Sequence, residues 1–302
     1  MERRTFLGRT LLTGAAMASG IGSVSASSPT KLMNAFKLKY APHLGMFSDI
    51  VGKDPLDQLD FMAERGFKAF EDNGMKKKEL SLQKAMGKRM ASHGMEMGVF
   101  VAHQINWKEP TLVLEDYRDA FLKEIQESVE VAKRVNATWM TVVPGFVNLR
   151  MQPEYQTAIL VETLKQASAI LEPHGLVMVL EPLNFRNHPG LFLSRIPQAY
   201  QICQAVGSPA CKILFDVYHQ QIQEGNLIPN MELAWDEIGY FQVGDNPGRK
   251  EPTTGEINYR NIFKFLHERE FQGIIGMEHG NSQPGADGAE AVIKAYQEVD
   301  GF

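Results

Sequence analysis

The stretch "HGLVMVLEPLN", residues 174–184, is an apolar run that ends on a carboxylate. Its segment Val177–Leu180 has the composition of a β-strand buried on both faces, as is typical of parallel sheets. Glu181 follows this strand directly and needs a partner, because an unpaired buried carboxylate is very costly. The same arrangement recurs in "KILFDVYHQ", where the strand ends on Asp216, and in "GIIGMEHG", where Glu278 follows the strand. Three apolar strands thus each place an acid at their carboxyl end.

Strand-like apolar runs alternate with amphipathic helical patterns from residue 37 onward. The predicted strands are Leu38–Leu44, Lys68–Glu71, Met97–Ala102, Thr138–Val143, Val177–Leu180, Lys212–Phe215, Gly239–Val243 and Ile274–Met277. Eight such units in about 265 residues match the size of an α/β fold of the (β/α)₈ type, a TIM barrel. No Gly-x-Gly-x-x-Gly follows the first strand, which argues against an open dinucleotide-binding sheet. No linker interrupts the series, so residues 37–302 are predicted to form one catalytic domain.

The first residues have the order of an export signal. Arg3 and Arg4 precede a mildly apolar segment, and the small residues Val24, Ser25 and Ala26 follow it. This order predicts a signal peptide of the twin-arginine type over residues 1–26, with a flexible leader over 27–36. The expected location is the periplasm, with membrane contact only during export. A flexible basic tail is the alternative interpretation.

Composition narrows the classes of partner. The chain has 302 residues, of which 44% are hydrophobic and 22% charged, and a formal net charge of -5. Lys76–Lys78 is the only basic run that stands out in the sequence, so nucleic-acid binding is not expected. Cys203 and Cys211 are too few for a disulfide framework. We expect two free, mostly buried thiols, and a single disulfide is the alternative.

The carboxyl ends of the strands in a TIM barrel carry the active site. This sequence places a ring of polar residues and one Pro-Gly pair there, namely His43, Glu71, His103, Pro144, Gly145, Glu181, Asp216, Gln242 and Glu278. Three carboxylates at one barrel mouth repel one another and retain a shared proton unless a cation neutralises them. Oxygen ligands suit Mg²⁺ or Mn²⁺ better than zinc, so a divalent cation of that kind is the predicted cofactor. As an alternative, each acid caps a helix or pairs with a nearby arginine.

The ordered motifs resemble a known group of proteins. "EPLN" at 181–184, "FDVYHQQ" at 215–221, "FQVGDNPGR" at 241–249, "GEINY" at 255–259 and "MEHG" at 277–280 are similar to the sugar isomerase/epimerase superfamily with a xylose-isomerase-like barrel. Within it, they are most similar to the hydroxypyruvate isomerases.

The resemblance implies a role for each matching residue. A metal site would consist of Glu181, Asp216, Gln242 and Glu278. Glu181 and Glu278 would also be the catalytic acid/base pair, and His219 and Arg249 would contact substrate. Ketose 3-epimerases of the superfamily have histidine where this chain has Gln242, whereas the hydroxypyruvate isomerase branch has glutamine.

The predicted chemistry is proton transfer in a small hydroxy-keto acid. Isomerising an α-hydroxy carbonyl moves a proton between neighbouring carbons through an ene-diolate, and two carboxylates can act as base and acid. His219 could donate to a substrate oxygen, and the planar guanidinium of Arg249 suits a substrate carboxylate. His103, at the end of the third strand, is the remaining candidate substrate contact.

We therefore predict an isomerase that interconverts a hydroxypyruvate-like acid and its aldehyde isomer. A ketose 3-epimerase on the same site and a non-catalytic periplasmic sugar-binding protein are the alternatives. A metal-dependent nuclease would need a basic groove, which this acidic chain lacks. Whether the chain forms a homo-oligomer is left open by the sequence.

Overall fold

The computed structural model describes residues 36–302, and the predicted signal peptide lies outside the described residues. Export to the periplasm therefore stays a prediction. Phe36, the first described residue, stacks its ring on Phe67 with a centroid distance of 5.0 Å.

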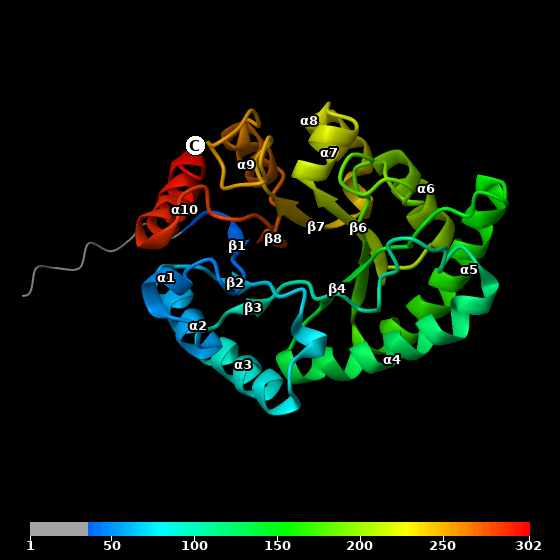
Figure 1. Ribbon diagram of the computed structural model, residues 1–302, viewed down its shortest axis with the longest axis horizontal. Coiled ribbons are helices and arrows are strands. Elements are labelled where there is room, and N and C mark those ends of the chain that lie inside the picture. The colour runs from blue at the N-terminus through cyan, green and yellow to red at the C-terminus, as the bar shows by residue number, and fades with distance from the viewer. Residues whose placement is uncertain (1–35) are drawn as a thin grey trace, which may run out of the picture. The chain divides into compact units, whose positions relative to one another are not determined.

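The described chain forms a barrel of parallel strands. They are β1 (Lys39–Ala41), β2 (Ala69–Phe70), β3 (Glu96–Met97), β4 (Trp139–Val142), β5 (Val177–Leu180), β6 (Cys211–Asp216), β7 (Ile238–Val243) and β8 (Ile274–Met277). A six-stranded sheet runs in the order β1-β8-β7-β6-β5-β4, and β2 pairs with β3. Parallel bridges between His43 and Glu71, and between Val101 and Thr141, connect these two sheets. The ring thus closes, as Figure 1 shows, and the predicted TIM barrel is confirmed.

The strands that position the candidate site have nearly the predicted bounds. β5 and β8 have the bounds expected from the sequence, β6 gains one residue at each end, and β7 gains one at its start. β1, β2, β3 and β4 are shorter than predicted, with three, two, two and four residues. Beyond β2 and β3, backbone hydrogen bonds from Gly98 to Phe70 and from Asp72 to Val99 continue the contact between the two segments. Isolated bridges join some of the remaining expected strand residues.

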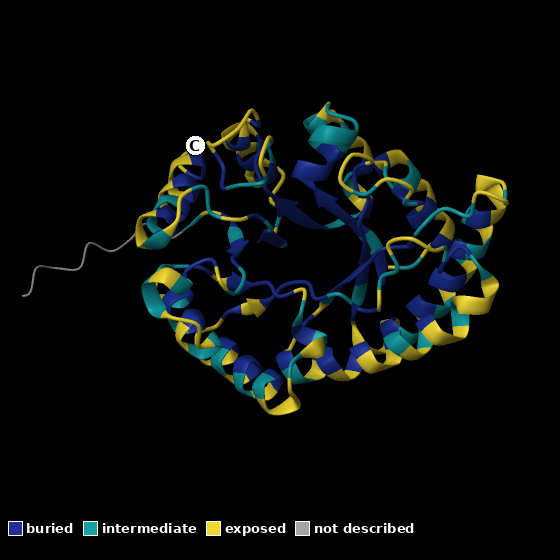
Figure 2. Cartoon of the chain, viewed as in Figure 1, coloured by how far each residue is buried: buried dark blue, intermediate teal, exposed yellow. Residues whose placement is uncertain are grey.

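Helices lie outside the barrel, and the faces that they turn toward it are buried, as the dark blue in Figure 2 shows. They are α1 (Ser48–Val51), α2 (Pro55–Glu64), α3 (Leu80–Ser92), α4 (Arg118–Val135), α5 (Pro153–Leu171), α6 (Ile196–Val206), α7 (Val217–Gln223), α8 (Leu227–Ala234), α9 (Tyr259–Glu268) and α10 (Gly285–Val299). In α4 the buried positions include Phe121, Ile125 and Val129, which recur at the helical period. Among the described residues, no helix has the length and apolarity needed to cross a membrane.

Two apolar layers hold the barrel together. The larger layer lies between strands and helices and contains both cysteines, which are free and buried as predicted. The smaller layer fills the barrel interior with one buried residue from each of seven strands or their extensions, namely Ala41, Ala69, Val99, Val179, Leu214, Tyr240 and Ile274. Because buried side chains fill this layer, the polar residues at the strand ends lie next to a packed barrel interior that limits their movement.

Candidate active site

Four predicted metal ligands lie at the carboxyl ends of neighbouring strands. Asp216 is the last residue of β6 and pairs in register with Gln242 of β7. Glu181 and Glu278 directly follow β5 and β8. Asp216 and Gln242 are fully buried, Glu181 is 8% exposed, and the side chain of Glu278 is 27% exposed. The four oxygen-bearing side chains therefore come from consecutive positions around one half of the barrel mouth.

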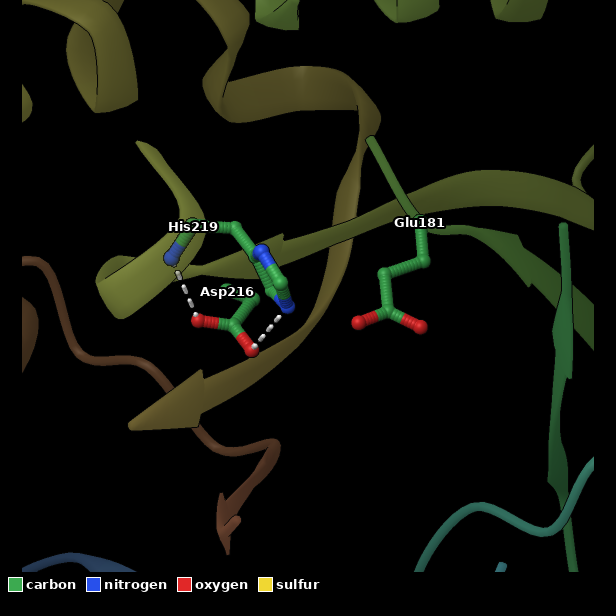
Figure 3. Close-up of side chains that lie close together, drawn as sticks. All are labelled: Glu181, Asp216 and His219. Atoms are coloured by element: carbon green, nitrogen blue, oxygen red, sulfur yellow. Dashed lines mark hydrogen bonds and ion pairs between the residues drawn. The ribbon is translucent and has the colours of Figure 1, made fainter. Parts of the chain in front are cut away.

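Glu181, Asp216 and His219 form the tightest group. Each offers one ligand atom, and these atoms lie within 4.8 Å of one another (Figure 3). Glu278 is not a member of that group and is connected to Asp216 through Arg249. Arg249 Nη2 donates to Asp216 Oδ2 and to Glu278 Oε2, each at 2.8 Å. For these two acids, the pairing with an arginine that the sequence left open is present.

Burial and mutual repulsion shift the acids toward their protonated forms. Burial raises the pKa of Glu181 well above 4.5, and the charges of Glu278 and Asp216 raise it further, against the opposing effect of Arg249. Burial also raises the pKa of Glu278, although Arg249 lowers it. A carboxyl group with a raised pKa can hold and release a proton near neutral pH, as an acid/base catalyst requires.

The hydrogen bonds around His219 determine which ring nitrogen carries its proton. Asn184 Oδ1 accepts from the backbone N–H groups of Arg186 and Asn187, at 3.1 and 2.8 Å, so the amide orientation of Asn184 is defined. Its Nδ2 therefore donates to His219 Nδ1 at 2.6 Å. Because Nδ1 accepts, the proton resides on Nε2 in the neutral ring.

His219 is placed to act as a hydrogen-bond donor. Burial lowers its pKa to about 4, so the ring is neutral at pH 7. Nε2 is buried, has no hydrogen-bond partner among residues 36–302, and lies 3.8 Å from Asp216 Oδ2. A protonated Nε2 cannot bind a metal ion. His219 is thus better suited to a substrate oxygen than to a metal, although it lies within the tight group.

Gln242 offers an oxygen to the cluster. Its Nε2 donates to Glu71 Oε1 at 2.8 Å, which leaves the amide oxygen on the other side. This Oε1 is buried and lacks a hydrogen-bond partner within the described part of the chain. A buried carbonyl oxygen without a partner is costly unless a cation or donor meets it. Three carboxylates and one amide oxygen form a hard donor set that fits Mg²⁺ or Mn²⁺.

Arg249 has donor capacity left beyond its two acids. Its Nε is buried and unpartnered among the described residues, and its guanidinium carbon lies 4.9 Å from the centre of the Tyr218 ring. The backbone of Arg249 is left-handed, with φ of 52°, which directs the loop after β7 back over the barrel mouth. A planar group in this position can receive a substrate carboxylate.

A cavity of about 420 Å³ is lined mainly by residues that follow β2 and β3. Asn73 is one of them and donates from Nδ2 to Glu278 Oε1 at 3.0 Å, although Glu278 itself does not line the cavity. His103 and Trp107 line it as well. His103 Nε2 accepts from the backbone of Val143 at 3.3 Å, which engages the nitrogen that could have met a ligand. The substrate contact predicted for His103 stays a prediction.

Sequence reasoning assigned no role to three residues that shape the site. Glu71 stood in the predicted ring at the strand ends, Asn73 follows it by two positions, and Asn184 closes the "EPLN" motif. Each acts on a residue far away in the chain, namely Gln242, Glu278 and His219. An unassigned polar residue within four positions of a strand end was the signal that could have identified them.

Comparison with known proteins identifies the family. The model of the "Xylose isomerase-like TIM barrel" family matches residues 59–299. The chain belongs to this family. The xylose isomerase-like fold is also that of the AP endonuclease, family 2, from Brucella melitensis, with a TM-score of 0.74 and 22% identity over 83% of this chain and 96% of that one.

Two curated relatives have a higher sequence identity over a smaller share of the chain. The hydroxypyruvate isomerase of Escherichia coli is 34% identical over 166 residues, which cover 55% of this chain and 62% of the relative. The 2-oxo-tetronate isomerase of Cupriavidus necator is 30% identical over 194 residues, which cover 63% of this chain and 75% of the relative. The match to the Escherichia coli protein thus spans less than two thirds of its length.

The raised pKa of Glu181 predicts that Glu181→Gln stabilises the metal-free protein at neutral pH. A carboxyl group whose pKa is higher in the folded state contributes stability that is complete below the unfolded value, near 4.5, and is lost as pH rises through the folded value. Glutamine has no such dependence. Melting temperatures measured against pH in chelator should therefore agree below about pH 4.5 and diverge above it, with the variant several degrees higher.

The exposed Glu64, at the end of α2, provides the matched control for removal of one negative charge. Glu64→Gln should change the melting temperature little at any pH. Parallel curves for Glu181→Gln and the unsubstituted protein over the whole pH range would contradict the prediction.

Proposed function

We propose that this protein is a metal-assisted isomerase that interconverts a small hydroxy-keto acid, such as hydroxypyruvate, and its aldehyde isomer. One observation carries the proposal. Glu181, a buried carboxyl group with a raised pKa, faces the neutral N–H donor of His219 across a site that also holds Glu278 and Arg249. The isomerase names of the two curated relatives support it.

The residues supply the parts of a proton transfer through an ene-diolate. One of Glu181 and Glu278 removes a proton from the carbon that bears the hydroxyl group, and the other supplies a proton to the neighbouring carbon, the former carbonyl carbon. The hydroxyl proton passes to the former carbonyl oxygen, so the numbers of protons and electrons are unchanged. His219 Nε2–H donates to the oxygen on which negative charge develops. A divalent cation held by Glu181, Asp216, Gln242 and Glu278 would supply positive charge that stabilises the ene-diolate.

Arg249 indicates that the substrate carries a carboxylate group. Its unpartnered Nε lies beside the same acids, so a substrate carboxylate bound there would be held next to the proton carriers. A neutral ketose offers no charge to this guanidinium. The glutamine at position 242 also agrees with the keto-acid isomerase branch that the sequence motifs resemble.

A substrate panel tests the proposal. The full chain, loaded with Mn²⁺, is assayed with hydroxypyruvate, with 2-oxo-tetronate and with a free ketose such as D-tagatose, and kcat/KM is compared. We expect the keto acids to be turned over faster than the ketose. Faster epimerisation of the ketose would indicate a 3-epimerase. Thermal stabilisation by ligands without any turnover would indicate a binding protein.

Arg249→Lys should lower kcat/KM for the keto acid by about tenfold or more and change that for a neutral ketose less. Lysine keeps the charge but loses the planar fork, and a hydrogen bond to a charged group contributes about 1.5–3 kcal/mol. The measurement is the ratio of the two kcat/KM values in the variant and in the unsubstituted protein. An equal loss for both substrates would mean that Arg249 shapes the loop and does not recognise a carboxylate.

A further inference from the structure

Glu71 is a buried carboxylate that the proposed reaction does not use. It follows β2, is 2% exposed, and contacts the side chain of Gln242. Its two oxygens have different partners. Oε1 accepts from Gln242 Nε2 at 2.8 Å, and Oε2 accepts from the Tyr240 hydroxyl at 2.9 Å.

Two glycines provide the space for this arrangement. A Cβ atom at Gly276 of β8 would overlap Glu71 Oε2, and a Cβ atom at Gly98 would overlap the hydroxyl of Tyr240. Gly276 also pairs in register with Gln242, so the backbone of β8 passes directly beside both side chains. Glycine at these two positions thus leaves the space that the side chains of Glu71 and Tyr240 occupy.

The contact between Glu71 and Gln242 determines how the amide is oriented. Both oxygens of Glu71 act as acceptors here, so Glu71 faces the NH₂ group of the amide. The oxygen of Gln242 then points away from Glu71, where it is buried and unpartnered among residues 36–302. An amide without such a partner could rotate by 180° and present its NH₂ group to the cluster instead.

We propose that Glu71 is a positioning residue that directs the amide oxygen of Gln242 toward Glu181, Asp216 and Glu278, and so completes a divalent cation site. This inference rests on the metal dependence in the proposed function and adds a residue to it. Partners that orient a metal ligand typically change metal affinity by about 10–100-fold when they are replaced. Gly276 leaves the space that the side chain of Glu71 occupies.

The experiment measures the Kd of Mn²⁺ by titration calorimetry on metal-free full chain, without substrate. Glu71→Gln should raise the Kd by about 10–100-fold, because an amide at position 71 accepts either orientation of Gln242. The melting temperature of the metal-free variant should not fall, since one buried carboxylate is removed. Weaker binding in a fully folded protein separates positioning from a general loss of structure.

Exchanging the two residues supplies a rescue. In Glu71→Gln combined with Gln242→Glu, the new amide donates to the new carboxylate, whose second oxygen can face the cluster. The net charge is unchanged, and Mn²⁺ affinity should return to within a few-fold of the original. Tyr240→Phe is the matched control, because it removes the other hydrogen bond of Glu71 and leaves the contact with Gln242; it should raise the Kd much less than Glu71→Gln does.

Three outcomes would overturn the inference. The first is an unchanged Kd in Glu71→Gln. The second is an equal loss of Mn²⁺ affinity in Tyr240→Phe and Glu71→Gln, together with no recovery of affinity when residues 71 and 242 are exchanged. The third is absence of Mn²⁺ binding by the unsubstituted chain. Failure of the proposed function would be seen separately, as a chain that binds Mn²⁺ with an affinity that depends on Glu71 but does not convert keto acids.

Discussion

Glu181→Gln and Glu278→Gln should each lower kcat for the keto acid by about 10²–10⁴-fold, which is the usual contribution of a positioned acid or base. Glutamine keeps the shape and one oxygen of each side chain but cannot carry the proton. Glu181 is only 8% exposed, so a proton that it accepts is shielded from solvent. Glu278 is partly exposed and contacts both Arg249 and Asn73, so its proton exchanges with solvent more easily.

Heavy water separates proton transfer from a hydride shift. Substrate and product recovered from heavy water should carry deuterium on the carbon next to the carbonyl group, whereas a hydride shift between the carbons would leave the label out. Because Glu181 is shielded, part of the original hydrogen is expected to return before exchange. One single variant can still exchange label without completing turnover, if the two groups serve different carbons.

Loss of only a few-fold in kcat for both variants would remove Glu181 and Glu278 from the proton path. Glu64→Gln, on the outer surface of α2, is the control and should retain full activity. Melting temperatures of all variants, measured with the assay, distinguish loss of chemistry from loss of structure.

Removal of divalent metal by a chelator should lower kcat by about 10³-fold, and Mn²⁺ or Mg²⁺ should restore it. A cation contributes several kcal/mol to the stabilisation of developing negative charge, and each 1.36 kcal/mol corresponds to a factor of ten in rate. The donor set is the reason for this expectation. Three carboxylates and the unpartnered oxygen of Gln242 remain incompletely neutralised, because Arg249 uses one nitrogen for two of the acids.

Restoring kcat with several metals in turn shows whether the oxygen-rich ligand set determines which metal the site prefers. Mn²⁺ and Mg²⁺ should restore activity better than Zn²⁺, and Gln242→His should shift the preference toward Zn²⁺, because imidazole is the ligand that zinc favours. Full activity in chelator, with an unchanged melting temperature, would mean that Arg249 alone neutralises the acids and that no cation takes part.

The sequence alone determined the barrel and the residue types at its mouth. Buried strands are short and apolar and alternate with amphipathic helices, so β5 and β8 could be delimited from local pattern alone. Parallel strands of one barrel end on the same face, and this rule by itself places Glu181, Asp216, Gln242 and Glu278 together. β1, β2, β3 and β4 were predicted too long, because the composition of one segment does not show how far its backbone pairs with the neighbouring strand.

Only the tertiary structure decided how these residues are paired. The proton of His219 is placed by Asn184, 35 residues away, and the amide of Gln242 is oriented by Glu71, 171 residues away. Arg249 bridges Asp216 and Glu278 because the loop after β7 returns over the mouth with a left-handed residue. Residue patterns report burial along one element, whereas a hydrogen bond between distant segments exists only once the barrel has closed and fixed their distance and direction.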